Sequence, residues 1–247
     1  MARVTVFHTS DMHNKLTADL AQRLHDLRNE HPESLMFDCG DAIWSGNIYW
    51  RPGGEPVHDL MNSVPYDAMC MGNREYHFLA AGIESKVSRA EFAVLSANLR
   101  STKPANGCSP TEPYIFFERD GIRIAVMGLS VPCITERMLV KKMSDYYFVP
   151  PIEAAMELVP ELRKQCDLLI ALTHIGIKVD RELADAVQGI DLILGGHTHV
   201  VTEQPERVGE TRILHSGFYA HYVRRVEIEL ENGRVDVTSE LMPLGKA

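Results

Sequence analysis

The sequence is short of cysteine, and it has neither a long apolar run nor an excess of basic residues. Its five cysteines are scattered over 247 residues, are odd in number and include no Cys-x-x-Cys pair. This usage excludes a disulfide framework and a Cys-x-x-Cys metal site, and it predicts a reduced, cytoplasmic protein. No apolar stretch is long enough to cross a membrane and no signal peptide is visible, so we expect no membrane partner.

The charge balance is acidic. Lysine and arginine number 25 against 34 aspartate and glutamate residues, which gives a formal net charge of −9. A chain of this charge is a poor partner for a nucleic-acid polymer. It still suits a small anionic substrate if bound divalent ions reverse the local field. Length and ordinary composition predict a single domain over residues 1–247, and they leave self-association into a homo-oligomer open.

Apolar stripes of helical period alternate with short apolar runs of strand length. The stripes predict helices near residues 16–27, 79–87, 152–159 and 183–187. Asp120-Gly121 and Asn232-Gly233 each separate two strand-like runs and predict hairpins. This alternation is typical of an α/β protein with mixed sheets and helices outside them.

Five polar clusters each stand just past one of the apolar runs. Open α/β sheets place their sites at the carboxyl ends of strands, where such clusters converge. Any one of these residues could be a helix cap or a turn residue. Together they predict that seven side chains of metal-ligand type meet at one sheet edge, namely Asp11, His13, Asp41, Asn73, His174, His197 and His199.

This set of side chains predicts a site for two divalent ions. Carboxylate, amide oxygen and imidazole together suit borderline metals such as Mn, Zn, Fe, Co or Ni, rather than calcium or an iron–sulfur cluster. Asp11 and His13, two residues apart at a strand end, can grip one ion, and so can His197 and His199. Seven ligands exceed the need of one tetrahedral ion. Asp41 stands alone between the two sets in sequence, so we expect its carboxylate to bridge two ions.

Taken in order, the five motifs resemble those of the calcineurin-like metallophosphoesterases, in the 5′-nucleotidase branch. The resemblance covers nearly the whole chain and lies in residues 8–14, 40–41, 72–75, 173–174 and 195–199. It implies a four-layer α/β/β/α sandwich of two mixed sheets flanked by helices. Full-length 5′-nucleotidases also carry a C-terminal nucleotide-binding domain, which we expect to be absent here.

The resemblance also implies a ligand assignment and a reaction. Asp11, His13, Asp41 and His199 would hold the first ion, and Asp41, Asn73, His174 and His197 the second. A hydroxide that bridges the ions would attack phosphorus. We therefore expect a phosphomonoesterase of nucleotidase type that acts on a small phosphorylated molecule.

The third motif departs from the family pattern. The nucleotidase branch reads Gly-Asn-His-Glu-Phe-Asp, whereas residues 72–77 read Gly-Asn-Arg-Glu-Tyr-His. Arginine stays protonated, so Arg74 can bind phosphate through its planar fork but cannot act as a general acid. His77 has an ordinary pKa near neutrality and is the candidate for protonating the leaving group. We expect Asn73, Arg74 and His77 to take part in catalysis, and Glu75 to support a ligand from behind.

Specificity is expected from the segment after Asp41, which holds both tryptophans. Trp44 and Trp50, with Arg74, are the candidate substrate-binding residues, although a core or dimer contact is an open alternative for the indoles. A second candidate segment for substrate binding holds Lys141 and Lys142.

Two other functions stay open: a phosphodiesterase with the same metal site, and a non-catalytic sensor that binds metal and a phosphorylated ligand. Retention of all seven ligand-type residues argues against the sensor.

Overall fold

Two six-stranded sheets and a small two-stranded sheet form the β structure of the protein in this computed structural model, which describes residues 2–103, 109–231 and 233–245. Cys108 and Asn232 lie outside these residues. The first large sheet has the order β14-β13-β1-β2-β3-β4, with strands Ala2–Thr9 (β1), Leu35–Asp38 (β2), Ala68–Cys70 (β3), Ala93–Leu95 (β4), Tyr222–Glu231 (β13) and Arg234–Pro243 (β14).

The second large sheet has the order β11-β12-β10-β9-β7-β6. Its strands are Tyr114–Arg119 (β6), Ile122–Ser130 (β7), Leu168–His174 (β9), Leu192–Gly195 (β10), Glu206–Val208 (β11) and Thr211–His215 (β12). The small sheet pairs Leu99–Ser101 (β5) with Tyr146–Phe148 (β8). Both large sheets are mixed, because a parallel centre is flanked by antiparallel strands at one or both edges.

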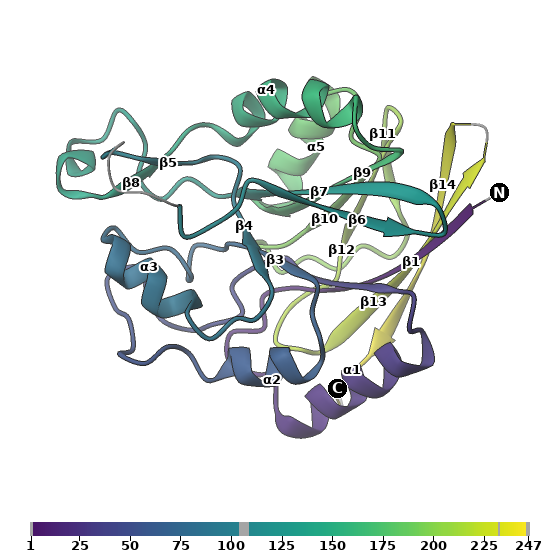
Figure 1. The fold of residues 1–247 in the computed structure, drawn as a ribbon, viewed down its shortest axis with the longest axis horizontal. Coiled ribbons are helices and arrows are strands. Elements are labelled where there is room, and N and C mark those ends of the chain that lie inside the picture. The colour runs from purple at the N-terminus through teal and green to yellow at the C-terminus, as the bar shows by residue number, and fades with distance from the viewer. Residues whose placement is uncertain (1, 104–108, 232, 246–247) are drawn as a thin grey trace.

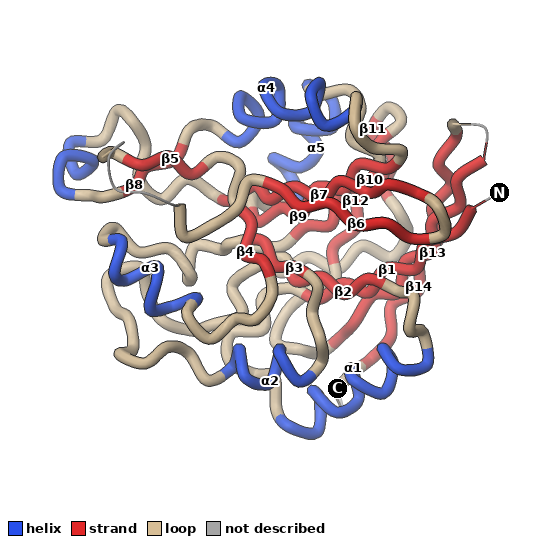
Figure 2. Tube along the Cα trace, viewed as in Figure 1, coloured by secondary structure: helices blue, strands red, loops and turns tan. Residues whose placement is uncertain are grey.

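Helices cover the outer faces of the two sheets, as Figure 1 and Figure 2 show. They are Ala18–Glu30 (α1), Val57–Ser63 (α2), Ala80–Val87 (α3), Pro151–Arg163 (α4) and Ile177–Ala186 (α5), with a 3₁₀ helix at Leu139–Met143. None of the helices in the described part of the chain combines the length and the apolarity needed to cross a membrane.

Three apolar clusters fill the spaces between the layers. One lies between the sheets and joins Val6 and Phe37 of the first sheet to Ile170 and Leu194 of the second. Another packs the first sheet against α1 and α2, and the third packs the second sheet against α4 and α5. The expected four-layer α/β/β/α sandwich is therefore confirmed.

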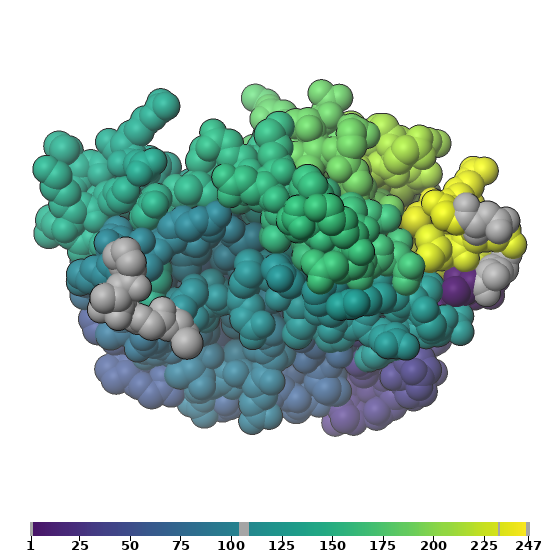
Figure 3. All heavy atoms as spheres, turned by 45° about the horizontal axis from the view of Figure 1, so that its top comes forward, coloured from purple at the N-terminus to yellow at the C-terminus, as the bar shows by residue number. Residues whose placement is uncertain are grey.

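The parallel strands of both sheets end on the same side of the molecule. In Figure 1, β1 runs from the N-terminus at the right toward the left, and β2, β3 and β4 run parallel to it. In the second sheet β7, β9, β10 and β12 are likewise parallel. On this left side, the segment around residues 131–148 projects outward at the upper left of the space-filling view (Figure 3). Because the parallel strands of both sheets end on this side, the polar clusters of the two sheets lie close together.

Candidate metal centre

The predicted ligands meet where the parallel strands end. Asp11 and His13 follow β1, Asp41 follows β2 and Asn73 follows β3, whereas His174 ends β9 and His197 and His199 follow β10. The expectation of one sheet edge was therefore too narrow. Three clusters belong to the first sheet and two to the second, and packing of the sheets face to face brings the two edges together.

Two groups of side chains each offer atoms within 4.8 Å of one another: Asp11 with His13 and His199, and Asp11 with Asp41 and His174. In the first group, His199 Nε2 is 3.4 Å and His13 Nε2 is 3.8 Å from Asp11 Oδ1. The two imidazole Nε2 atoms lie 3.1 Å apart. Both nitrogens therefore point at one carboxylate oxygen.

The second group is centred on His174, which is fully buried. Its Nδ1 lies 2.7 Å from the Cys39 carbonyl oxygen. A carbonyl only accepts, so Nδ1 donates to it, and Nε2 is the ring nitrogen that faces the cluster. That Nε2 is 3.4 Å from Asp41 Oδ1, and the ring of His197 lies 5.0 Å from the His174 ring.

The two histidines of the last motif divide between the groups. His197 lies beside His174, whereas the His199 ring lies 5.1 Å from that of His13. This division matches the expected assignment of one histidine to each ion. In one respect the geometry differs from the expectation, because Asp11, rather than Asp41, belongs to both groups.

Several side-chain oxygen and nitrogen atoms of the cluster are buried without a hydrogen-bond partner. They are Asp11 Oδ1, His13 Nδ1, Asn73 Oδ1 and His174 Nε2. Asp11 Oδ2, by contrast, accepts hydrogen bonds from the Ser10 hydroxyl and, at 2.9 Å, from the His197 backbone N–H. Buried polar atoms are normally paired. The unpaired Asp11 Oδ1 and His174 Nε2 belong to the two groups of candidate ligands and fit divalent ions of the kind expected from the sequence.

The electrostatics of the cluster also fit a cation. Burial by itself would raise the pKa of Asp11, but the neighbouring His199 and the charge of His174 hold this pKa at about 2. Burial by itself would lower the pKa of His174, yet the negative charge of Asp41 raises it to about 10. Burial lowers the pKa of His13 and His197, so these rings are neutral and available as ligands.

The backbone at these positions is left-handed. Five of the seven predicted ligands have a positive φ, although none is glycine: Asp11 (51°), His13 (47°), Asp41 (55°), His197 (78°) and His199 (57°). Such a conformation costs on the order of 1–3 kcal/mol per residue and is concentrated at functional sites. It turns each side chain out of its strand direction and toward the cluster.

Two glycines beside the ligands are required by close approach. A Cβ atom on Gly196 would lie 2.3 Å from Ser10 Oγ and 2.9 Å from Asp11 Oδ2. A Cβ atom on Gly72 would lie 2.3 Å from Asp41 Oδ1. Any larger residue at either position would displace a predicted ligand.

Glu75 supports Asp41 from behind. Its Oε2 accepts hydrogen bonds from the backbone N–H groups of Asp41 at 2.9 Å and Gly72 at 2.8 Å. Burial, together with the charge of Asp41, raises the pKa of Glu75 to about 7. Glu75 thus orients the loop that carries Asp41, in agreement with its expected supporting role.

Arg74 and Trp44 lie at the mouth of the cluster. The Arg74 backbone N–H donates to Asp41 Oδ1 at 2.7 Å, and its side chain is 35% exposed with Nε 3.8 Å from Asp41 Oδ2. The guanidinium carbon lies 5.6 Å from the Trp44 ring, and the indole contacts the His13 ring at 5.3 Å. Both residues therefore lie beside predicted ligands, and their role in substrate binding stays a prediction.

His77 and Trp50 are not brought to the cluster. The His77 ring is fully buried, accepts a hydrogen bond from the Leu79 N–H at 3.0 Å, and stacks on Phe78. Trp50 packs edge-on against His77, with ring centroids 4.7 Å apart. The expectation that His77 protonates the leaving group and that Trp50 binds substrate is corrected here, because the two rings pack on each other rather than at the site.

Sequence reasoning missed three residues that shape the site. Phe218 stacks on His199 at 4.7 Å, and the Tyr219 N–H donates to the Asp11 carbonyl at 2.8 Å. Lys86 is fully buried and donates through Nζ to the backbone carbonyls of Gly46, Arg74 and Tyr76. A buried lysine with three acceptors fastens the tryptophan loop to the third motif.

Comparison with curated proteins and a family model gives the family. The family model described as calcineurin-like phosphoesterase matches residues 4–201. The chain is 30% identical to the trifunctional nucleotide phosphoesterase protein YfkN of Bacillus subtilis, over 96% of this chain and 19% of that protein. It is 28% identical to the 5′-nucleotidase of Bos taurus, over 79% of this chain and 38% of that protein. The chain thus spans about half, or less, of the length of the curated relatives it matches.

Solved structures share the fold. The NAD nucleotidase NadN of Haemophilus influenzae matches with a TM-score of 0.82 at 20% identity, over 98% of this chain and 56% of that one. The sulfate thiohydrolase SoxB of Thermus thermophilus matches with a TM-score of 0.79, also at 20% identity, over 98% of this chain and 56% of that one. Two differently named activities at equal similarity mean that the fold does not set the substrate. The chain belongs to the calcineurin-like phosphoesterase family, a family of metal-dependent phosphoric ester hydrolases.

Proposed function

We propose that the protein hydrolyses phosphomonoesters of small molecules and uses two divalent ions held by the seven predicted ligands. The observation that carries this proposal is the pair of ligand groups that share Asp11, with buried donor atoms that have no partner within the protein. A single structural ion would not need this many converging ligands.

The ligands divide between the two ions as follows. Asp11, His13 and His199 hold the first, through Asp11 Oδ1 and the two Nε2 atoms that face it. Asp41, His174, Asn73 and His197 hold the second. As the family resemblance implies, Asp41 would be shared by the two ions, and its Oδ1 lies 3.4 Å from His174 Nε2. Asp11, which belongs to both groups of side chains, would contribute only Oδ1, since its Oδ2 accepts hydrogen bonds from the Ser10 hydroxyl and the His197 N–H.

When bound, two such ions supply Lewis acidity: they activate a water as nucleophile and neutralise phosphoryl charge. The chain contributes position and fixed charge. Arg74 binds the non-bridging phosphate oxygens through its fork, held over Trp44 at the edge of the site. Arg74 keeps its proton and the His77 ring is buried against Trp50, so neither residue of the third motif would protonate a leaving group. We therefore expect a preference for esters with weakly basic leaving groups.

The monoester is favoured over the diester because it carries more negative charge beside the permanent cation of Arg74. The test compares 4-nitrophenyl phosphate with bis(4-nitrophenyl) phosphate, each with Mn²⁺, Zn²⁺, Fe²⁺, Co²⁺ and Ni²⁺. We expect faster release from the monoester with at least one metal. Faster release from the diester would make the protein a phosphodiesterase. Binding of metal and phosphate without any release of nitrophenolate would favour the sensor.

Three expectations stay predictions: the cytoplasmic location, the single-domain organisation and the absence of nucleic-acid and membrane partners.

A further inference from the structure

An apolar cavity of about 310 Å³ lies between the tryptophan loop and the segment that projects at the edge of the molecule. It is lined by Asn47, Ile48, Tyr76, Phe78, Cys133, Ile134, Val140 and Met143. Apart from Asn47 and the phenol of Tyr76, the lining side chains are apolar, and Tyr76 already uses its hydroxyl in hydrogen bonds to Ser144 and to the Tyr146 carbonyl. The cavity thus offers contact area rather than polar recognition.

One wall of the cavity is continuous with the third motif. Tyr76 stands two residues after Arg74, whose N–H donates to Asp41 at 2.7 Å. Lys86 Nζ donates to the carbonyls of Tyr76 and Gly46, each at 2.9 Å. This wall is therefore held at a fixed position relative to Arg74 and Asp41.

The opposite wall is continuous with the end of β7. The Val131 N–H donates to the carbonyl of His174 at 3.0 Å, and Cys133 follows in the lining. Cys133 therefore stands two residues from a hydrogen bond to the predicted ligand His174. Asn47 Nδ2 lies 3.8 Å from Cys133 Sγ and joins the two walls.

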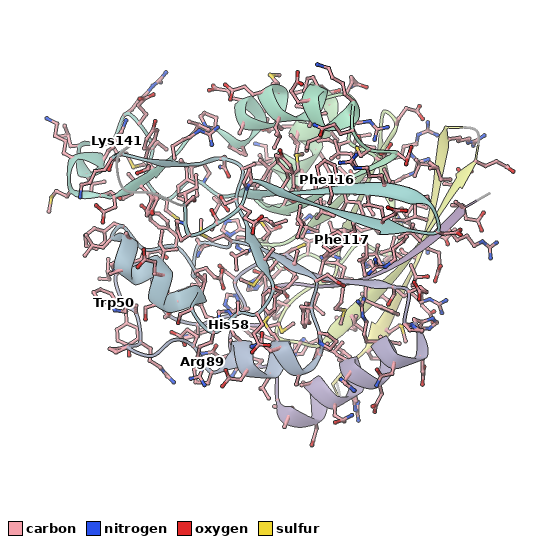
Figure 4. All side chains as sticks on the ribbon, in the orientation of Figure 1. Trp50, His58, Arg89, Phe116, Phe117 and Lys141 are labelled. Carbon is pink, nitrogen blue, oxygen red and sulfur yellow. The ribbon has the colours of Figure 1, made fainter. Side chains whose placement is uncertain are left out.

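Apolar side chains stand exposed on the rim. Ile48 is 81%, Met143 73% and Val140 43% exposed, although most large apolar side chains of the described residues are buried in the three clusters. Figure 4 shows Trp50 and Lys141, which mark the two sides of this region, on separate projections at the left of the molecule. Clustered exposed apolar residues beside a cavity are typical of a binding surface.

We propose that this cavity binds the leaving group of the substrate and that this group is an uncharged, apolar alkyl or aryl group. The inference rests on the proposed function, because it places the phosphate at Arg74 and the metal centre. The rest of the ester then extends along Tyr76 into the cavity. The volume is at the small end for ligand sites and suits one ring or a chain of about six carbons.

The test measures binding of alkylphosphonates, which carry a phosphate-like group but cannot be hydrolysed. Ethyl-, butyl- and hexylphosphonate are titrated calorimetrically into the Mn²⁺-loaded protein. Full burial of each methylene corresponds to about a fourfold gain in affinity. We expect Kd to fall at least about 20-fold from the ethyl to the hexyl compound, with a negative heat-capacity change.

Two neighbouring residues provide a matched pair of variants. Val140 lines the cavity, whereas Leu139 is 83% exposed and does not line it. We expect Val140→Asp to weaken hexylphosphonate at least about 10-fold and ethylphosphonate less than about twofold, because the charge meets only the longer chain. Leu139→Asp should change neither. Ile48→Glu repeats the test from the opposite wall, and both parent side chains are exposed enough for the variants to fold.

The outcomes separate this inference from the function on which it rests. A Kd independent of chain length, or equal effects of Val140→Asp and Leu139→Asp, would overturn the leaving-group site. If Val140→Asp dissociates a dimer in sedimentation while the chain-length dependence stays, the cavity is a contact between copies and the inference is wrong. Failure to release phosphate from 4-nitrophenyl phosphate, with chain-length-dependent binding intact, would reject the proposed function alone.

Discussion

At the residue scale, the predicted metal site is formed by sharp backbone turns at the ends of the strands. Asp11, His13 and Asp41 take up the left-handed backbone that glycine adopts more easily. Gly72 and Gly196 leave room for the carboxylates of Asp41 and Asp11. Buried oxygen and nitrogen atoms without a partner destabilise an empty site, but they can bind a cation when one is present. The same residues therefore carry both the strain and the proposed chemistry.

Arg74 gives the sharpest prediction at the residue scale. We expect Arg74→Ala to lower kcat/KM for 4-nitrophenyl phosphate by about 2–4 kcal/mol, or roughly 30- to 1000-fold, as for loss of one oxyanion donor. Arg74→Lys should recover part of the loss, because it keeps the charge but not the planar fork. Steady-state kinetics measure both, and Arg51→Ala, an exposed arginine of the preceding loop, is the control. A change below twofold in Arg74→Ala would mean that the side chain does not touch substrate.

The seven ligand-type residues could be predicted from sequence because they stand in five clusters, each at the end of a strand run. Lys86 could not, since its three carbonyl partners lie in irregular loop segments outside its own helix and a helical lysine normally faces solvent. His77 and Trp50 were misplaced for a related reason. Their nearness to Asn73 and Asp41 in sequence says nothing about the direction in which a loop turns.

At the level of elements, the helices and the hairpin predicted from the sequence patterns are present in the structure. The stripes at 16–27, 79–87, 152–159 and 183–187 correspond to α1, α3, α4 and α5, although the last was expected to be shorter, and the hairpin β6–β7 turns at Asp120-Gly121. The short helix α2 and the small β5–β8 sheet have no comparable periodicity. They are formed by packing rather than by local preference, which is why sequence reasoning does not find them.

Helix α2 carries a buried histidine whose titration should be visible in stability. His58 is fully buried, its ring nitrogens have no partner, and burial lowers its pKa to about 4. Above pH 6.5 the ring is neutral in both folded and unfolded chains. Below that pH the unfolded chain binds the proton first, so stability is lost as pH falls toward 4.

The expected size of this effect is about 2–3 kcal/mol of unfolding free energy between pH 7 and pH 4.5. Urea denaturation of the metal-free wild type and of His58→Gln at both pH values measures it. The variant should show a smaller loss over this range by that amount, whatever its stability at pH 7. Parallel profiles for the two proteins would mean that His58 titrates normally in the folded chain.

At the scale of the whole molecule, the site exists because two sheets end together. The patterns in the sequence indicate that strands are present, but they do not say which strands share a sheet, so a single edge was expected. The four-layer sandwich was predicted from the family resemblance, and the structure shows that the site depends on it. Asp11, Asp41 and Asn73 reach the site from the first sheet, and His174, His197 and His199 reach it from the second.

A site shared between sheets also links metal binding to the integrity of the fold. Ions that bind only the folded chain stabilise it by mass action. Asp41 lies at the junction, where its Oδ1 is 3.4 Å from His174 Nε2 of the second sheet. Its replacement is therefore the natural control for any measurement of the metals.

The central claim is that two divalent ions at this junction make the protein a phosphomonoesterase, and a metal titration tests it most directly. Chelator-treated wild type and Asp41→Asn are titrated with Mn²⁺, while bound metal and phosphate release from 4-nitrophenyl phosphate are measured on the same samples. We expect release in the wild type to rise from background and to level off at two ions per chain. Asp41→Asn should bind less metal and lose nearly all activity while keeping its circular dichroism spectrum. Full activity without metal, or in Asp41→Asn with two ions still bound, would contradict the account.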